Sequence, residues 1–405
     1  MDKKIIIISF LLLPIIIMTT GPARAQLVSG ERAVLDEFYI STGGNNWIDH
    51  TDWDSGVSEC LWNGITCNQD MDHIQEIRLP DNNLSGSIPP EIDNLSGLQW
   101  LDLSGNTPLA GSTIPSMSNL LDLRHLNLRD CGLIGSIPDL STSSFLNFLN
   151  LEDNSLGDPN VDNDIPNTLG SLDLLRSLLL SNNNLTGTIP PDLESLDALL
   201  TLDLSQNRLE GEIPSELGGL DSLQYLYLYG NKLDGPIPGN LDDDLVDTLT
   251  YCDIRWNALY TSDDDLSTFF TDRQAGGDWE SYQTIAPTNL DAGDADDGSI
   301  TLTWTAIAYT GDNGGYEVWY RPSGGSWKLF ETTSDKTVTT YTVTGLSSGT
   351  NYSFRVRTLT EQHTNNPDND VYSQYATTSA TTTGEDDEGG CFINTTTFKV
   401  FSIFK

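Results

Sequence analysis

The residue types that most often carry catalysis are sparse in this chain and widely separated. The four histidines are His50, His73, His125 and His363. No H-E-x-x-H, G-x-S-x-G or phosphate-binding glycine loop occurs, so the motifs that place a metal, a nucleophile or a phosphate at fixed spacing are missing. Cys60 and Cys67 form a C-x6-C pair, which differs from the C-x2-C spacing typical of zinc ligands. We therefore expect a protein that is not an enzyme and that needs no cofactor.

Carboxylates are the abundant ionisable groups. The chain carries 59 Asp and Glu against 19 Lys and Arg, a formal net charge of −40. Such a surface repels nucleic acid and anionic lipid, so we expect neither as a partner. Aspartate-rich loops, such as the one with Asp158, Asp162 and Asp164, leave calcium sites open as an alternative, although no EF-hand or glycine-nonapeptide spacing appears. We favour solubility in a salty exterior as the reason for the charge.

A repeat dominates the sequence and defines the elements that must position any site. Alignment on L-x-x-L-x-L-x-x-N/C-x-L gives eight copies over residues 74–260. The L-x-L alternation predicts a short strand with inward leucines, and stacked copies bury one continuous leucine core. Where the chain turns, a ladder of asparagines is expected to bond backbone groups: Asn82, Asn106, Asn154, Asn183, Asn207, Asn231 and Asn257. Cys131 holds that place in the third copy and is expected to be a buried free thiol.

A specific signature follows the asparagine in most copies. It reads LSGSIP (84–89), LIGSIP (133–138), LTGTIP (185–190), LEGEIP (209–214) and LDGPIP (233–238). By these motifs, residues 30–283 resemble the plant-type leucine-rich repeat family. The resemblance implies an α/β-type solenoid of mostly short parallel strands with an irregular or 3-10 convex side. It also implies ligand recognition, as in receptor ectodomains and polygalacturonase-inhibiting proteins. The segment LGDPNVDNDIP (156–166) departs from the signature and is expected to bulge from the convex side.

Both ends of an open solenoid need a cap, because terminal leucines would otherwise face water. Residues 26–73 contain a short amphipathic helix, a Gly-Gly stop and two tryptophans, an order that looks like the amino-terminal cap of the same family. The resemblance implies a cap disulfide between Cys60 and Cys67. Residues 261–283 are expected to close the other end with a helix that carries Leu266, Phe269 and Phe270.

From residue 284 to 383 the repeat gives way to alternating apolar residues in stretches rich in Thr, Tyr and Val, which are typical of β-strands. About a hundred such residues predict an all-β, immunoglobulin-like sandwich. The segment resembles a fibronectin type III domain. Trp304 stands where that family has its core tryptophan, and GLSSGTNYSFRV resembles its tyrosine-corner segment, which makes Leu346 and Tyr352 structural. Ser347 replaces the usual proline. We expect this domain to act as a spacer.

The two ends of the chain predict its location. Residues 1–25 have two lysines, an apolar run and Ala-Arg-Ala, as a secretory signal peptide does. No later stretch is apolar for the roughly 20 residues that a membrane span needs, so we expect a secreted or cell-surface protein in which disulfides persist. The signal and the acidic composition favour a bacterial source. Residues 384–405 are expected to form an acidic, disordered tail with an odd thiol at Cys391.

The curved inner face of the sheet is the expected binding site, because the third, fifth and seventh positions of each copy point outward there. The first candidate is an aromatic patch of Tyr225, Tyr227, Tyr229 and Tyr251, with Arg255 and Trp256 nearby. The second candidate consists of Trp100, His125 and Phe148. Aromatic and arginine side chains are enriched in interface hot spots. The alternative for both groups is that outward aromatics raise strand propensity.

Two functions are compatible with these features. The first is an extracellular recognition or adhesion protein that binds a protein, peptide or glycan through the concave face. The alternative is a secreted polysaccharide-degrading enzyme, or its accessory or inhibitor. Such an enzyme needs two carboxylates roughly 5 to 10 Å apart. The concave carboxylates fall in different copies: Asp102, Glu152, Asp203 and Asp253. We therefore favour binding.

Overall fold

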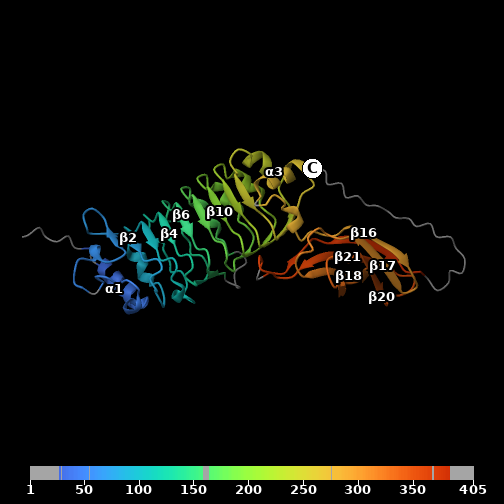
Figure 1. Ribbon diagram of the computed structural model, residues 1–405, viewed down its shortest axis with the longest axis horizontal. Helices are drawn as coiled ribbons and strands as arrows, with labels where there is room; N and C mark the ends of the chain where they lie inside the picture. The colour runs from blue at the N-terminus through green and yellow to red at the C-terminus, as the bar shows by residue number, and fades with distance from the viewer. Residues whose placement is uncertain are drawn as a thin grey trace, which may run out of the picture.

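A leucine-rich repeat solenoid is followed by an antiparallel β domain in the computed structural model (Figure 1). The structure describes residues 27–28, 30–53, 55–157, 164–274, 276–366 and 369–383. The solenoid is built on a nine-stranded sheet in the order β1-β2-β3-β4-β6-β8-β10-β12-β14, and every pair after β1 and β2 is parallel. This architecture confirms the expected fold class. The proposed signal segment and the tail with Cys391 lie outside the described residues.

Short strands line the concave side of the solenoid. They are β1 (Ile65–Cys67), β2 (Ile74–Arg78), β3 (Trp100–Asp102), β4 (His125–Asn127), β6 (Phe148–Asn150), β8 (Ser177–Leu179), β10 (Thr201–Asp203), β12 (Tyr225–Tyr227) and β14 (Tyr251–Asp253). Side chains alternate along a strand, so the central leucine of β3, Leu101, is fully buried while Trp100 and Asp102 face outward. The repeat pattern therefore sets which residues can meet a ligand.

The asparagine ladder holds neighbouring repeats together. Asn207 is almost completely buried, and its Nδ2 donates to the carbonyl oxygens of Leu180, Leu204 and Ser205 at 2.9, 3.2 and 3.1 Å. Its Oδ1 accepts from the backbone N–H of Leu185 at 3.1 Å. In the third repeat the Cys131 thiol donates to the Leu103 carbonyl at 3.1 Å. Cys131 is a buried free thiol, as expected, and burial raises its pKa to about 12.

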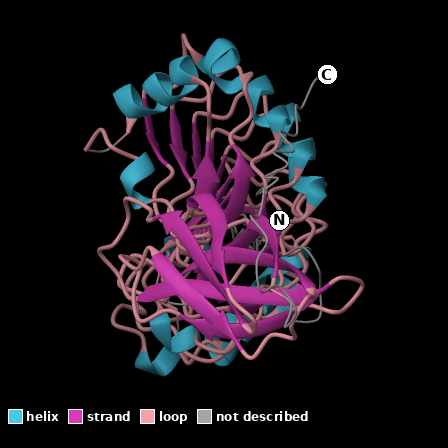
Figure 2. Cartoon of the chain, turned by 90° about the vertical axis from the view of Figure 1, so that its right-hand side faces the viewer, coloured by secondary structure: helices cyan, strands magenta, loops and turns pink. Residues whose placement is uncertain are grey.

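Short helical turns and short parallel β-strands form the convex side, and Figure 2 shows the helices around the outside of the strands. The turns are η3 (Pro90–Asn94), η4 (Thr107–Leu109), η5 (Asn167–Ser171), η6 (Pro191–Ser195), η7 (Ser215–Gly219) and α2 (Leu241–Leu245). The strands are β5 (Ile134–Gly135), β7 (Ser155–Leu156), β9 (Thr186–Gly187), β11 (Arg208–Gly211), β13 (Lys232–Pro236) and β15 (Ala258–Tyr260). The signature glycine is needed here, because Gly187 has a φ of 84° and Gly235 a φ of 96°.

The amino-terminal cap seals the first repeat. It contains α1 (Glu31–Ser41), η1 (Gly44–Asn46), η2 (Glu59–Leu61) and β1. Three buried tryptophans pack beneath α1, with ring centres 4.8 Å apart between Trp47 and Trp53 and 4.8 Å between Trp53 and Trp62. A disulfide joins Cys60 to Cys67, as the family resemblance implied. The Cys60–Cys67 disulfide therefore belongs to the amino-terminal cap and not to a metal site.

A helix closes the other end. Asp263 caps α3 (Asp264–Arg273) by accepting from the backbone N–H groups of Asp265 and Leu266. The expected apolar side chains Leu266, Phe269 and Phe270 are buried against the last repeat, and so is Trp279, which precedes η8 (Glu280–Tyr282).

The β domain is a sandwich of two antiparallel sheets. One contains β16 (Thr288–Ala295), β17 (Ser299–Thr305) and β20 (Thr340–Thr344). The other contains β18 (Gly314–Pro322), β19 (Lys328–Thr332), β21 (Asn351–Thr360), β22 (Val371–Tyr372) and β23 (Ala376–Thr381). Trp304 and Leu346 lie in the core between them. The Tyr352 hydroxyl accepts from the Ser347 N–H at 2.9 Å, so the tyrosine corner forms without the usual proline. In the described part of the chain, no helix has the length and apolar character that crossing a bilayer requires.

Candidate functional site

The parallel register places outward residues of successive repeats directly beside one another. Trp100 pairs with His125, His125 with Phe148, and Tyr225 with Tyr251. Adjacent strands lie about 4.8 Å apart, which is within the range of ring-centre separations between paired aromatic side chains. The concave face therefore gathers side chains that are far apart in the sequence into columns.

The first column is an aromatic stack near the amino-terminal end, which we call the aromatic column. The rings of Trp100 and His125 are nearly parallel with centres 3.5 Å apart, and His125 and Phe148 stack at 4.3 Å. The Arg78 guanidinium covers the open face of Trp100 at 3.9 Å. Burial lowers the pKa of His125 to about 4, against the attraction of Asp102. The imidazole is therefore neutral at pH 7 and behaves as an aromatic ring.

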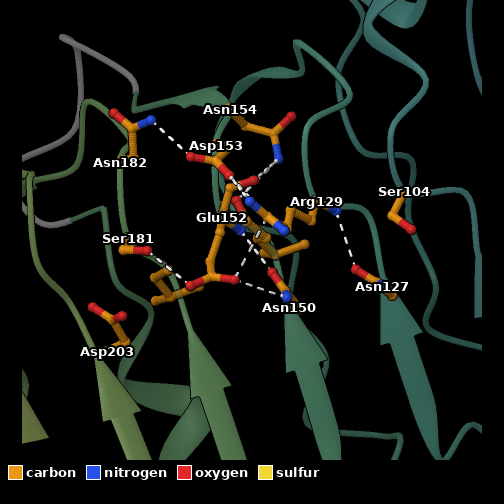
Figure 3. A network of polar contacts seen from close by, with 12 residues as sticks. Ser104, Asn127, Arg129, Asn150, Glu152, Asp153, Asn154, Ser181, Asn182 and Asp203 are labelled. Atoms are coloured by element: carbon orange, nitrogen blue, oxygen red, sulfur yellow. Dashed lines mark hydrogen bonds and ion pairs between the residues drawn. The ribbon is translucent and has the colours of Figure 1, made fainter. Parts of the chain in front are cut away.

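A polar network follows at the ends of the middle strands (Figure 3). Arg129 pairs with Asp153 at 2.7 Å, and Asn182 donates to the other oxygen of Asp153 at 2.8 Å. Glu152 accepts from Asn150 and from Ser181, both at 2.9 Å. These groups bond one another across three repeats, so they stiffen the centre of the face.

Most side chains at the fifth position of the repeat accept a hydrogen bond within the turn that follows their strand. Asp102 and Asp203 each accept the backbone N–H two residues ahead, from Ser104 at 3.1 Å and from Ser205 at 3.0 Å. Asn127, Asn150 and Asp253 do the same. Burial raises the pKa of Asp203 to about 6, against the bonds from Ser205. These carboxylates therefore have a structural role in the turns. Their contacts do not indicate a catalytic pair of one general acid and one general base.

The second column is the tyrosine patch, consisting of Tyr225, Tyr227, Tyr229 and Tyr251. Tyr227 and Tyr251 lie with ring centres 5.5 Å apart. Tyr225 is 38% exposed, whereas Tyr229 is more enclosed, and burial raises its pKa. The patch thus offers one open and several half-covered rings at the carboxy-terminal end of the face.

Arg255 and Trp256 have more specific environments than the sequence indicated. Arg255 forms a two-point ion pair with Asp253, at 3.0 Å from Nε and 2.6 Å from a terminal nitrogen. Trp256 lies beside the patch, where its ring contacts Tyr229, Tyr282 and His363 with centres 6.1, 5.5 and 6.4 Å away. His363 belongs to the β domain. Arg255 is therefore held by a neighbour in its own repeat, and Trp256 lies at the joint between the two domains.

The backbone of Trp256 is unusual. Its φ is 54°, a left-handed conformation that bulky residues rarely adopt. The equivalent position, just before each ladder asparagine, is also left-handed and is occupied by Gly, Asp, Asn or Gln in the other repeats: Asp81, Gly105, Asp153, Asn182, Gln206 and Gly230. A tryptophan in place of these small or polar residues is the sequence signal that could have identified the joint.

The sequence did not reveal the loop that completes the joint. Asn366 and Asn369 are buried, and their side-chain amides donate to the backbone carbonyls of Asn231 at 2.9 Å and Asn207 at 2.6 Å. A Cβ on Gly230 would lie 2.5 Å from the carbonyl oxygen of Asn365 in the same loop, so glycine is needed there. The β domain is thus docked on the last repeats, not suspended from a free linker.

The acidic loops offer no evident cation site in the part of the chain described. No group of three or more His, Cys, Asp or Glu side chains is close enough to hold a metal ion among these residues. Asp164 is buried and accepts from the N–H and hydroxyl of Thr186 at 2.7 and 2.8 Å. Asp158 and Asp162 lie outside the described residues. Calcium binding in this loop stays a prediction.

Comparisons with known proteins agree with both parts of the fold. A fibronectin type III domain model matches residues 285–374, and leucine-rich repeat models match residues 73–95, 122–143 and 173–233. The chain therefore contains leucine-rich repeats and a fibronectin type III domain. Over 55 residues it is 42% identical to the LRR receptor-like serine/threonine-protein kinase SIK1 of Oryza sativa subsp. japonica, which is 14% of this chain and 6% of that protein.

Two further relatives extend the similarity. Polygalacturonase inhibitor 2 of Arabidopsis thaliana is 33% identical over 130 residues, 32% of this chain and 38% of that protein. The solved LRR ectodomain of the Arabidopsis receptor kinase HAESA, in complex with an N-terminally extended IDA peptide hormone ligand, is 29% identical with a TM-score of 0.50. That match covers 60% of this chain and 40% of the other. The chain thus spans well under two thirds of these relatives. Because they are plant proteins, they do not support the expected bacterial source.

Proposed function

We propose that this protein recognises an extracellular peptide or protein through the concave face of its repeats. The observation that supports this most directly is the pair of outward aromatic groups, the aromatic column and the tyrosine patch, at the two ends of one sheet. A rigid aromatic surface loses little conformational entropy on binding and often provides hot spots. The related HAESA ectodomain was solved with a peptide hormone ligand, a precedent for peptide binding by such a solenoid.

The chemistry of the face fits an extended ligand with apolar anchors at both ends. Between the aromatic groups lies the polar network around Glu152 and Asp153, in which the Arg129 side chain is 55% exposed and can donate its outer N–H groups to a ligand. The docked fibronectin type III domain serves in this proposal as a rigid spacer, because Asn366 and Asn369 fix its orientation against the last repeats. A flexible spacer would leave the orientation of the face undefined.

Capture from the native extracellular medium tests the proposal. The immobilised full chain is compared with a Tyr227→Ala, Tyr251→Ala variant, and captured peptides and proteins are identified by mass spectrometry. Two hot-spot truncations at roughly 1–2 kcal/mol each weaken binding about 30- to 1000-fold. Thermal unfolding is expected to stay almost unchanged, because both rings are outside the core. Tyr260→Ala is the matched control, since Tyr260 is 44% exposed on the convex side. Equal capture by all three proteins would contradict the proposal.

Inhibition of a secreted polysaccharide hydrolase is a second candidate. The similarity to polygalacturonase inhibitor 2 favours it over the enzyme alternative, since an inhibitor also needs only a binding face. Purified chain is titrated into a polygalacturonase assay and also incubated alone with polygalacturonate. Loss of hydrolase activity would support inhibition, whereas turnover by the chain alone would show an enzyme and remove binding as the whole account.

A further inference from the structure

The outer face of one sheet of the fibronectin type III domain gathers tryptophan, tyrosine and arginine side chains. Tyr320, Phe330 and Phe354 pack toward the core of the domain. Because side chains alternate along a strand, their neighbours on β18, β19 and β21 point outward. We call this surface the arginine–tryptophan face, and it consists of Trp319, Arg321, Trp327, Leu329, Arg355 and Tyr375. Tryptophan, tyrosine and arginine are the residue types enriched in the hot spots of protein interfaces.

Aromatic rings hold the two arginines of this face in place. The guanidinium carbons of Arg321 and Arg355 each lie 4.5 Å from the ring centre of Trp327. Arg355 also lies 4.0 Å from the ring centre of Tyr375 and 5.0 Å from that of Trp319. Its Nε is buried, so its two terminal nitrogens are the donors that a ligand can meet. Two such nitrogens match the two oxygens of a carboxylate.

The same side of the sheet shows how arginine and tryptophan hold a carboxylate together. Oε2 of Glu317, on β18, accepts from Nε1 of Trp319 at 3.0 Å and from Nε of Arg357 at 2.8 Å. Neither arginine that stacks on Trp327 forms an ion pair or a side-chain hydrogen bond within the described ranges, and Nε1 of Trp327 has no acceptor there either. One arginine and tryptophan group is therefore filled by an acid of the chain itself, and the adjacent group is not.

We propose that the arginine–tryptophan face binds an extended acidic segment of a partner polypeptide. Carboxylates of the segment accept from the terminal N–H groups of Arg321 and Arg355, as Glu317 does in the adjacent group. Charge complementarity supports an acidic occupant, because the chain has 19 Lys and Arg against 59 Asp and Glu and yet brings two unpaired arginines together here. The face belongs to a different domain from the concave sheet, so the assignment does not depend on the function proposed for the repeats.

The strand register sets the spacing of the acids in the ligand. Arg321 pairs with Ser353 of β21, and Arg355 lies two residues further along that strand. The two arginines are thus diagonal neighbours, whose side chains start about 7–8 Å apart. In an extended chain, side chains two residues apart lie on one face with a separation of about 6.6 Å. The match predicts a ligand with Asp or Glu at alternate positions.

Leu329 favours a polypeptide over a purely anionic polymer. It is 46% exposed and pairs with Trp319 across β18 and β19. Arg321 is two residues from Trp319 on β18, so Leu329 and Arg321 are also diagonal neighbours. An apolar side chain of the ligand, placed beside its acids, would cover Leu329 and gain free energy by removing apolar surface from water. A polyuronate has the carboxylates but lacks this apolar group.

Titration of the full chain with a labelled peptide tests the proposal. The probe is the capped peptide Thr-Glu-Thr-Glu-Thr-Leu-Thr, and binding is followed by fluorescence anisotropy at an ionic strength of about 0.15 M, where the net charge acts over only about 8 Å. Arg321→Ala with Arg355→Ala is expected to weaken binding roughly 5- to 30-fold, the effect of two exposed charge pairs. Arg124→Ala is the matched control, since Arg124 also stacks on a ring, that of Phe145 at 5.2 Å, but on the solenoid.

A second variant tests the face without removing its arginines. Leu329→Glu places a carboxylate on the face itself, where it competes with those of the peptide for the same N–H groups. We expect Leu329→Glu to weaken binding more than Leu329→Gln, which loses only the apolar contact. Because Leu329 is exposed, both variants should unfold at the same temperature as the native chain, so a folding defect in the arginine variant cannot mask the outcome.

Three comparisons can overturn the proposal. The first is equal binding of the peptide with glutamine in place of glutamate, or binding that the arginine variant leaves unchanged. The second is hexagalacturonate that binds through the same arginines as tightly as the peptide, which would show a site for polyanions in general. The third is the Tyr227→Ala, Tyr251→Ala variant, which should bind the peptide normally. Loss in that variant alone would assign the peptide to the concave face and leave the function proposed for the repeats intact.

Discussion

Removal of one ladder asparagine provides a quantitative test of how the repeats are held together. In Asn207→Ala, three backbone carbonyls, of Leu180, Leu204 and Ser205, lose a donor, and the Leu185 N–H loses its acceptor. All four groups lie in a region from which water is excluded. An unsatisfied buried group costs about 1–3 kcal/mol, but carbonyls retain other partners and the turn relaxes in part. We therefore expect a loss of about 3 kcal/mol in the free energy of unfolding.

Urea unfolding followed by circular dichroism measures this loss. Asn147→Ala is the matched control, because Asn147 has no side-chain hydrogen bond within the described structure, and it should change the free energy of unfolding by less than about 0.5 kcal/mol. Asn207→Cys should fall between the two, since the Cys131 thiol donates to only some of the equivalent carbonyls in its repeat. If the Asn207→Ala and Asn147→Ala variants unfold at the same urea concentration, the ladder does not stabilise the solenoid as argued.

Three further predictions concern charge, the domain joint and the cap. The pKa of Asp203 lies above its ordinary value, at about 6, so the charged form costs stability above pH 6 and this cost disappears as the pH falls towards 4. Asp203→Asn should therefore raise the free energy of unfolding in urea by about 1–2 kcal/mol at pH 7.5 but not at pH 3.5, and a gain independent of pH would contradict the cause. Asn366→Ala with Asn369→Ala should free the β domain and increase the radius of gyration in X-ray scattering, whereas an unchanged profile would show that other contacts suffice. Cys60→Ser should lower cap stability by about 2–3 kcal/mol in thermal unfolding, given the short loop, and a reducing agent should abolish the difference from the native chain.

Much of the fold could be predicted from local pattern. The leucine spacing and the L-x-G-x-I-P signature predict strand, turn and convex segment in each repeat, because each copy contacts only its neighbours. The same logic predicted the outward columns, and the register brings Trp100, His125 and Phe148 into one stack. It did not predict that Arg78, a fifth-position residue, covers this stack. The angle at which a long side chain leaves a curved sheet depends on neighbours that no repeat pattern encodes.

The concave-face carboxylates and the contact between the two domains show a second limit of prediction from sequence. The sequence places Asp203 and Asp253 on the concave face, but only the tertiary structure shows that each accepts the N–H group two residues ahead. A free carboxylate and a turn-forming one look alike in sequence. Asn366 and Asn369 contact residues more than a hundred positions away, and no periodicity links the two domains. Only Trp256 could have been noticed in the sequence, because it occupies a left-handed position at which the other repeats have Gly, Asp, Asn or Gln.

Local patterns in the chain were enough to predict the repeating solenoid, its amino-terminal cap, the second β domain and the set of side chains that line the concave face, while the family resemblance implied the cap disulfide. These depend on contacts between neighbouring residues or neighbouring copies, and such contacts recur with a fixed period. Three further features follow only from the tertiary structure: which of those side chains bond one another, how the fibronectin type III domain docks, and that Arg321 of β18 and Arg355 of β21 stack on the same tryptophan, Trp327. Each of these depends on surfaces that meet once in the molecule, so no repetition in the chain records them.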